Sequence, residues 1–312
     1  MHLRPSGQII AAAEGDCKDG DAMEIRKPVV AGQFYPADRE TCLAQVRECL
    51  ASAASEGPLP ECLVAGIVPH AGWTFSGSLA AMVFAAAKKQ RETVGTFVIF
   101  GAAHGYFGPK PVLDGSNAWD TPLGRIKIDD SLRQFLLDAG VAVVDSAAHR
   151  GEHSIEVQLP FIQHLFPDAW ILPVIVPPNE ASIPLGQAVA SGPPDGDKPT
   201  VCIGSTDLTH YGPRYGFTPM GIGSEALHWA GSVNDRQFID LALAVEPQRL
   251  LVNAIENGNA CGPGAAAAVL SAAKKLGVQK GTLLAHTTSN EIMLRKMGTV
   301  SRESVGYAAI VL

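Results

Sequence analysis

The sequence lacks the features of a membrane protein and of an exported one. None of its apolar runs approaches the roughly 20 residues that a helix needs to cross a bilayer. The N-terminus, MHLRPSGQIIAAAEGDCKDGDAMEIRKP, has one short apolar stretch followed by acidic residues, so it does not resemble a signal peptide. Six cysteines are scattered through 312 residues without the spacing of a disulfide framework. We therefore expect a soluble cytoplasmic protein with reduced thiols.

Positive charge is also scarce. The 24 Lys and Arg residues and the 31 Asp and Glu residues give a formal net charge of −7, and no basic stripe with interleaved aromatic residues is present. Binding to nucleic acid needs clustered Lys and Arg to neutralise phosphates, so nucleic acid is not expected as a partner. Hydrophobic residues make up 46% and charged residues 18% of the chain, which favours a large buried core over disorder.

What the sequence does contain, from Lys27 onward, is an alternation of strand-like and helix-like segments. Short apolar runs predict strands at 62–68, 96–101, 141–145, 170–176, 200–204, 281–287 and 305–312. Longer amphipathic or Ala-rich runs predict helices at 78–92, 129–140, 152–166, 234–244, 247–258 and 263–277. This pattern predicts a single α/β domain over 27–312 with a mainly parallel central sheet flanked by helices. A poorly ordered extension is expected at 1–26.

Reactive side chains follow several expected strands at the points where the strands end. His70 comes two residues after the first strand, His104 follows the second, and both Asp207 and His210 follow another. Ligand sites in open α/β sheets lie outside the carboxyl ends of the strands, so these side chains are expected to converge. Any one of the histidines is explained equally well by packing. The coincidence of three favours a functional site.

The segment HRGEHSIEVQLPF (149–161) carries further ionisable groups. If it is helical, Glu152 and Glu156 share one face, and His149 and His153 bracket Glu152. The segment is then either a polar patch that faces the strand ends or a solvated helix start with favourable charges. The spacing alone does not decide between these two interpretations.

Cys261 has a setting that the other five cysteines lack. It lies among turn residues in NGNACGPGAAAAV, at the N-terminus of an Ala-rich helix. Exposed N–H groups and the helix dipole stabilise a thiolate at such a position. Cys261 is therefore a candidate nucleophile or soft metal ligand, and the alternative is a small buried residue at a tight turn.

Two chemistries fit this set of histidine, aspartate and cysteine side chains. The first is a divalent metal ion held by imidazoles and an anion. The second is Cys–His nucleophilic catalysis, with Asp207 orienting a histidine. The surplus of histidines favours a metal, since a nucleophilic pair needs only one. The chain has no compact zinc signature such as CxxC or HExxH, so the fold would have to assemble any metal site.

Taken in order, six segments of the chain resemble the motifs of the MEMO family, whose bacterial and archaeal members are often called AmmeMemoRadiSam system protein B. The segments are VVAGQFYPAD (29–38), IVPHAGWTFSG (67–77), FGAAHGYFG (100–108), GEHSIEVQLPF (151–161), GSTDLTHYG (204–212) and ACGPGA (260–265). The resemblance runs from about Lys27 to Leu312, and the combination of PHAG, EHSIE and STDLTHYG is highly specific. It implies an α/β fold related to the class III extradiol dioxygenases typified by LigB.

The resemblance also implies a metal site. His70 and His104 match the two metal-binding histidines of the family, and Cys261 matches its metal-binding cysteine. The implied cofactor is one transition-metal ion, with iron or copper favoured and zinc as a third candidate. Dioxygenases instead hold Fe(II) with two histidines and one carboxylate. A thiolate in the third position is softer and changes the redox behaviour of the centre.

The remaining polar residues resemble the catalytic side chains of the dioxygenases. His210 resembles their acid/base histidine, His153 their substrate-facing histidine, and Asp207 is expected as a neighbour in the same pocket. The metal would then serve a redox or dioxygenase-like role on an unknown substrate. Two alternatives remain open: a non-enzymatic module that binds a peptide or partner in the same pocket, and a metal-free Cys–His hydrolase.

The name of the bacterial family links it to a radical-SAM protein. This chain has no CxxxCxxC cluster motif of its own. Any such link would therefore be made through a partner protein.

Overall fold

A computed structural model describes residues 23–53, 59–60, 62–193 and 199–312. Most of the expected N-terminal extension, residues 1–22, lies outside this part of the chain. Ile25 and Arg26, which the sequence places in the extension, form the short strand β1 (Ile25–Arg26) and pair with the chain at Ala118 and Trp119.

The elements alternate along the chain as the apolar pattern predicts. The strands after β1 are β2 (Ala65–Val68), β3 (Thr96–Gly101), β4 (Val112–Leu113), β5 (Ala118–Thr121), β6 (Gly124–Lys127), β7 (Val143–Val144), β8 (Trp170–Ile175), β9 (Thr200–Ser205), β10 (His210–Tyr211), β11 (Thr282–Thr288) and β12 (Ser304–Val311). The helices are α1 (Arg39–Ala51), α2 (Trp73–Gln90), α3 (Asp130–Asp138), α4 (Ser146–His149), α5 (Leu159–Leu165), α6 (Ser182–Ser191), α7 (Ser224–Trp229), α8 (Asp235–Leu243), α9 (Pro247–Asn257), α10 (Pro263–Lys275) and α11 (Ser289–Met297).

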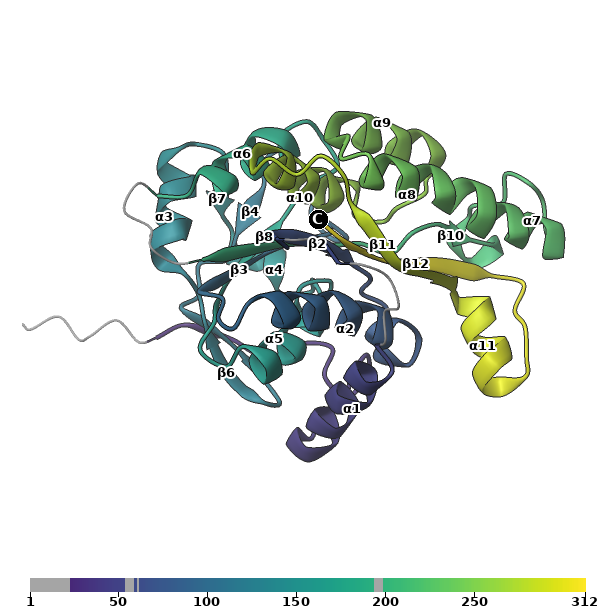
Figure 1. Ribbon diagram of the computed structural model, residues 1–312, viewed down its shortest axis with the longest axis horizontal. Coiled ribbons are helices and arrows are strands. Elements are labelled where there is room, and N and C mark those ends of the chain that lie inside the picture. Colours follow the sequence, from purple (N-terminus) through teal and green to yellow (C-terminus); the bar gives the residue numbers. More distant parts are fainter. Residues whose placement is uncertain (1–22, 54–58, 61, 194–198) are drawn as a thin grey trace, which may run out of the picture.

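The main sheet is mixed rather than mainly parallel. Its strand order is β10-β12-β2-β9-β3-β8-β4-β7, and β11 pairs with β12. The four central strands β2, β9, β3 and β8 are parallel, and so is the edge pair β4–β7. Strand β12 is antiparallel to β2, β10 and β11, and β4 is antiparallel to β8. The chain between β11 and β12 forms α11, which projects beyond the end of the sheet instead of crossing its face (Figure 1). The strand after it therefore returns antiparallel.

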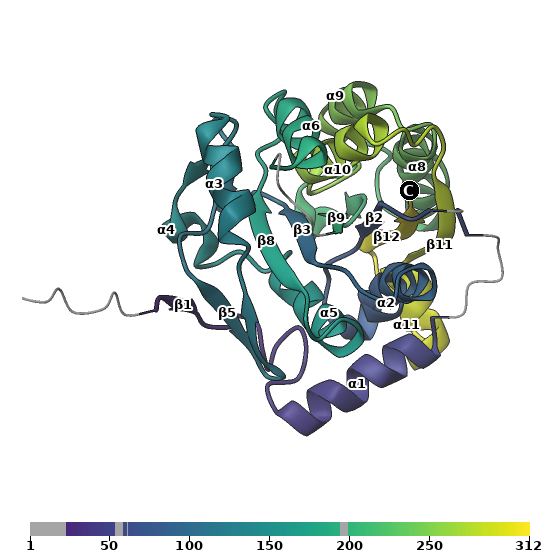
Figure 2. The same cartoon turned by 60° about the vertical axis from the view of Figure 1, so that its left-hand side comes forward.

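Helices cover both faces of the main sheet (Figures 1 and 2). Helices α6, α9 and α10 lie on one face, and α1, α2 and α5 lie on the other. A small separate sheet of β1, β5 and β6 lies at one side. In the part of the chain that the structure describes, every helix is too short or too polar to cross a membrane.

The predicted helix at 152–166 begins later than expected. Residues 152–155 are not helical, a 3₁₀ turn covers Glu156–Gln158, and α5 begins at Leu159. The side chain of Glu152 accepts the N–H of Ser154 at 2.8 Å, and such a local bond competes with helix formation. Pro160 lies in the first turn of α5, where proline does not interrupt the helix.

The parallel strands bring their carboxyl ends to one edge of the sheet. His70 follows β2, His104 follows β3 and Asp207 follows β9, and these three strands are adjacent in the order β2-β9-β3. Because β12 is antiparallel to β2, it starts at the same edge, where Val305 and Tyr307 lie. The sequence-predicted convergence at the strand ends is therefore a property of the fold.

Helix α10 packs unusually close to its neighbours, which fixes the position of Cys261 just before it. A Cβ atom at Gly204 of β9 would lie 2.5 Å from Val269 Cγ1, and one at Gly186 of α6 would lie 2.2 Å from Ala268 O. Only glycine allows these approaches. The Ala-rich helix is thereby held against the sheet with its N-terminal end at the site.

Candidate metal centre

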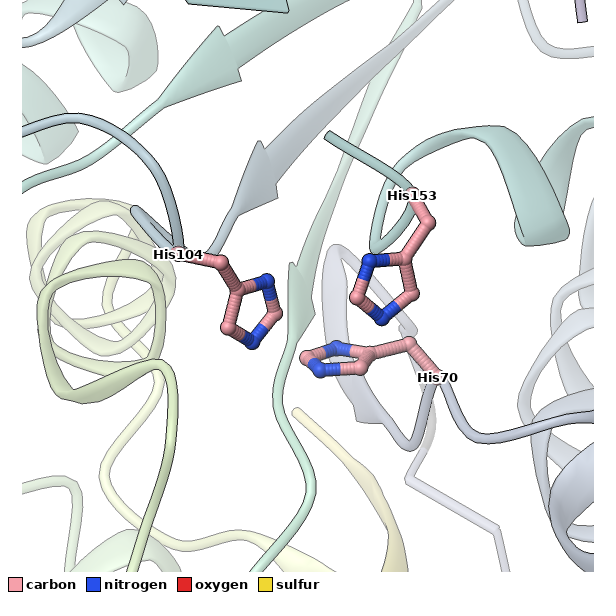
Figure 3. A group of neighbouring side chains, drawn as sticks. All are labelled: His70, His104 and His153. Atoms are coloured by element: carbon pink, nitrogen blue, oxygen red, sulfur yellow. The ribbon is translucent and has the colours of Figure 1, made fainter. Parts of the chain in front are cut away.

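Three imidazoles converge at this edge of the sheet. His70 and His104 come from the segments after β2 and β3, and His153 comes from the loop before α5 (Figure 3). One nitrogen from each ring can be chosen so that all three lie within 4.8 Å of one another. Neutral imidazole nitrogens at this separation form a group that could hold a metal ion.

The ring of His70 is fixed in one tautomer by its neighbours. Its Nδ1 lies 3.1 Å from Ser205 Oγ, and Ser205 donates its own hydrogen to Ser154 O at 2.7 Å. Ser205 must therefore accept a hydrogen from Nδ1, which leaves the lone pair of Nε2 for a ligand. Burial lowers the pKa of His70, so the ring is neutral near pH 7.

Glu152 holds the ring of His104. Both carboxylate oxygens of Glu152 lie 3.1 Å from His104 Nδ1, and one also accepts the backbone N–H of His104 at 3.2 Å. Burial acts to lower the pKa of His104, but the hydrogen bonds to Cys261 and Glu152 outweigh it and raise the pKa to about 10. His104 is therefore an imidazolium when no metal is bound, and Nε2 is its coordinating nitrogen once that proton is lost.

His153 differs from His104 in its charge. Its ring stacks on that of His104 with centroids 4.8 Å apart and an interplanar angle of 13°. Burial lowers the pKa of His153 to about 4, against the raising effect of Glu152, and the neighbouring His104 and His210 lower it further. His153 is accordingly a neutral imidazole, ready to coordinate or to accept a proton.

Cys261 lies directly beside the three histidines. Its Sγ is 3.1 Å from His70 Nε2 and accepts the backbone N–H of Asp207 at 3.3 Å. Burial acts to raise the pKa of the thiol, but the neighbouring His70 and His104 outweigh it and lower the pKa from 9.0 to about 7. The sequence predicts a depressed pKa from the helix N-terminus; in the structure the neighbouring histidines account for it.

Asp207 and His210 lie at the same cavity but make no contact with the thiol through their side chains. Asp207 Oδ1 accepts the backbone N–H groups of His70 at 2.7 Å and Ala71 at 3.3 Å. The carboxylate therefore positions the backbone of His70, and Ser205 holds the ring. His210 Nδ1 lies 3.1 Å from Leu208 O. Burial raises the pKa of Asp207, against the lowering effect of His210.

A cavity of about 600 Å³ opens over the group. Five of its polar lining residues are the predicted site residues His70, His104, His153, Asp207 and His210. Aromatic side chains complete the wall at Phe34, Phe75, Tyr215 and Tyr307. The arrangement places neutral and charged imidazoles and a buried carboxyl group at one opening, and the Cys261 thiol lies beside His70. These are groups that can bind a metal and exchange protons with a bound molecule.

Several contacts that build the site are not predicted by the sequence. Ser205 orients the ring of His70, and Glu152 orients the ring of His104. Arg26 holds the loop that carries Glu152, because its guanidinium donates to the backbone oxygen of Glu152 at 2.7 Å. Glu152 has a sequence signal, because it directly precedes His153, but Ser205 has none. His149 lies away from the site: it is buried and its Nε2 contacts Val112 O at 3.0 Å.

The pH dependence of alkylation tests the state of Cys261 in metal-free protein. With a pKa of about 7, the thiol is protonated below that pH and reactive above it, so the iodoacetamide rate should reach half its maximum near pH 7 instead of 9. The rate is measured by mass spectrometry of the peptide that contains Cys261. His104→Ala removes the imidazolium that hydrogen-bonds the thiolate and should move the midpoint upward. A midpoint near 9 in the unaltered protein would contradict the described contacts.

Comparison with known proteins finds relatives over nearly the whole chain. A family model described as Memo-like protein matches residues 26–311. The MEMO1 family protein of Methanopyrus kandleri is 35% identical over 298 residues, which cover 92% of this chain and 98% of that protein. The MEMO1 family protein of Pyrococcus furiosus is 35% identical over 297 residues, with 92% and 99% covered, and that of Methanosarcina barkeri is 33% identical over 292 residues, with 92% and 100% covered.

Proposed function

The chain belongs to the MEMO family, and we propose that it binds one transition-metal ion at this centre and uses it for redox chemistry on a molecule held in the cavity. The observation that carries the proposal is the convergence of imidazole nitrogens from three segments beside a thiol of depressed pKa. The proposed ligands are His70, His104 and Cys261. His153 is the fourth donor within reach.

The state of each donor fits a metal. The Nδ1 atoms of His70 and His104 are held by Ser205 and Glu152, so both rings present Nε2, as metal-bound histidines with an outer hydrogen-bond partner do. A set of two imidazoles and one thiolate suits iron, copper or zinc, and the thiolate favours the softer ions. The metal would supply Lewis acidity and, for iron or copper, electron transfer.

The chain's own groups would bind the molecule and move protons. His153 is neutral and lines the cavity, so it can accept a proton from a bound molecule. Asp207 has a raised pKa and can hold a proton at its carboxyl group, and His210 lies at the same cavity as the proposed acid/base residue. Phe34 and Tyr307 add aromatic side chains to the wall of the cavity.

Proton release on metal binding tests the proposed ligands. Zn(II) is a suitable probe because it has no redox chemistry. At pH 8, Cys261 is already mostly thiolate and His104 must lose its proton, so we expect about one proton per metal ion. At pH 6 the thiol contributes as well, and about two protons are expected. Calorimetry in two buffers of different ionisation enthalpy measures both values, and the absence of release at pH 8 would exclude His104 as a ligand.

We expect Glu152 to strengthen metal binding without being a ligand itself. Glu152→Gln keeps the shape of the side chain but removes the charge that holds Nδ1 of His104. Loss of such a partner weakens metal binding by about 10- to 100-fold. A competition titration with a chromophoric chelator measures the affinity, and Glu48→Gln, an exposed residue on α1, is the matched control. Equal affinities in the two variants would contradict the role of Glu152.

A metal-free Cys–His nucleophile is the second candidate, because His70 Nε2 and Cys261 Sγ are 3.1 Å apart. The two candidates differ in their response to chelation. A hydrolase of this kind would keep its ester-cleaving activity after the metal is removed and lose it in Cys261→Ser. Activity that requires added metal supports the metal centre instead.

A further inference from the structure

Two short segments of the chain meet at the metal centre. The Asp207 segment (residues 206–210) follows β9 and carries Asp207 and His210, and the Cys261 segment (residues 258–262) joins α9 to α10. The backbone N–H of Cys261 donates to Asp207 O at 3.2 Å, and Asp207 Oδ1 accepts the backbone N–H of His70 at 2.7 Å. The place of the Cys261 sulfur beside His70 therefore depends on what holds these two segments.

A π-helical turn, Ala230–Asn234, reaches both segments through its last residue. Asn234 is fully buried, and its Nδ2 donates to Thr209 Oγ1 at 3.1 Å and to Asn257 O, at the end of α9, at 3.1 Å. Its backbone oxygen accepts Nδ2 of Asn259 at 3.1 Å. One residue thus bonds to the Asp207 segment at Thr209 and to the Cys261 segment at Asn259. π-helical turns occur frequently at functional sites.

The partners of the two buried amides fix their orientation. The backbone oxygen of Asn257 can only accept a hydrogen bond, so the NH₂ group of Asn234 must face it. The NH₂ group of Asn259 must face the backbone oxygen of Asn234 for the same reason. A side chain at position 234 without an N–H donor cannot replace these bonds.

The next residue, Asp235, holds the same threonine by a second bond. Asp235 Oδ1 accepts the backbone N–H of Thr209 at 2.9 Å, and its Oδ2 lies 2.9 Å from His286 Nε2. A Cβ atom at residue 306 would lie 1.9 Å from Oδ2, so Gly306 leaves the room that this buried carboxylate needs. Asn234 and Asp235 therefore bind the hydroxyl and the N–H of one residue, which lies between the two site residues of the Asp207 segment.

We propose that Asn234 and Asp235 are positioning residues of the metal centre, and that the π-helical turn directs both side chains at Thr209. They hold the Asp207 segment against the Cys261 segment and so keep the sulfur of Cys261 at 3.1 Å from His70 Nε2. The inference rests on the proposed function, because it assigns these residues to the metal site. The place of the thiol beside His70 is, however, a property of the metal-free chain and can be measured without a metal.

Two readouts test this role: the pH profile of Cys261 alkylation in metal-free protein, and the affinity for Zn(II) from competition with a chromophoric chelator. Asn234→Ala removes both bonds of the amide, so the sulfur is held less closely to the histidines that lower its pKa. The alkylation midpoint should rise from about 7 toward 9. The Zn(II) affinity should fall about tenfold, the lower end of the range for an outer partner of a metal ligand, because Asn234 acts through the backbone.

Two further changes separate the individual bonds. Thr209→Val keeps the shape of the side chain and removes the hydroxyl that accepts from Asn234, so both readouts should change in the same direction as in Asn234→Ala. Asp235→Asn keeps an oxygen for the N–H of Thr209 and should leave both readouts unchanged, whereas Asp235→Ala should alter them.

Gln90→Ala is the control for a general loss of stability, which urea denaturation measures in every variant. Gln90 is a half-buried amide that bonds to the backbone of Pro60 and Leu63, before the start of β2 and so at the far end of that strand from His70. Its replacement should leave the midpoint and the affinity unchanged.

An unchanged midpoint in both Asn234→Ala and Thr209→Val, or an equal shift in Gln90→Ala, would overturn the proposal. If Asn234→Ala does not fold, the midpoint in Thr209→Val decides alone. Absence of Zn(II) binding by the unaltered protein would contradict the proposed function instead, and the alkylation midpoints would still show whether Asn234 and Asp235 position the thiol.

Discussion

Replacing Glu156 with alanine is expected to lower the free energy of unfolding by about 3–5 kcal/mol. Glu156 is fully buried and accepts hydrogen bonds from Arg26 at 2.9 Å, from the backbone of Val29 and Val30, and from the hydroxyl of Tyr35 at 2.9 Å. The alanine variant would leave the Arg26 guanidinium, whose side chain is 8% exposed, without its counter-charge. It would also leave two backbone N–H groups unpaired.

Chemical denaturation with urea measures this loss. The control is Asp240→Ala, which breaks the Arg236–Asp240 pair of α8, whose side chains are 55% and 56% exposed. Exposed pairs at this spacing contribute only about 0.3–0.5 kcal/mol. Equal losses in the two variants would show that the buried contacts of Glu156 do not hold the N-terminal segment to the domain.

The second large effect is expected at the thiol. Cys261→Ala should weaken metal binding by more than the 10- to 100-fold range that is typical of an outer partner, because it removes a proposed ligand. Cys62→Ala, at an exposed cysteine, should leave the affinity unchanged. Competition titration with a chelator gives both values. An unchanged affinity in Cys261→Ala would mean that the three histidines bind the metal without the thiolate.

The metal affinities of His70→Ala and His153→Ala test which of the two histidines is a ligand. His70 Nε2 contacts the Cys261 sulfur at 3.1 Å, whereas the nearest ionic contact of His153 Nδ1 is Glu152 at 3.8 Å. We therefore expect the larger loss of affinity in His70→Ala. The opposite order would assign the third ligand position to His153, the residue that completes the three-imidazole group.

The strand ends show why sequence could predict the convergence of the site. The apolar runs at 65–68, 96–101 and 200–205 are buried at nearly every position, and parallel strands place the segments after them at one edge of the sheet. No such argument fixes the direction of a terminal strand. Whether β12 runs with or against β2 depends on where α11 lies, and that is decided by tertiary packing, not by local pattern.

The contacts that orient the proposed ligands are harder to predict from the sequence. Ser205 meets His70 across 135 positions of the chain, and Arg26 meets Glu156 across 130. A serine at a strand end and an arginine near the N-terminus carry no local signal of these roles. The helix predicted from Glu152 also fails for a local reason, because the carboxylate bonds to Ser154 N and turns toward His104.

Elemental analysis of protein purified without oxygen tests the central claim most directly. The unaltered protein is compared with His70→Ala and Cys261→Ala, each also after reconstitution with Fe(II) or Cu(I) and removal of loosely bound ions. We predict close to one iron or copper ion per chain in the unaltered protein and a clear loss in both variants. Metal absent from all three proteins, even after reconstitution, would contradict the metal centre. It would favour the alternative that the cavity binds a peptide or partner without a metal.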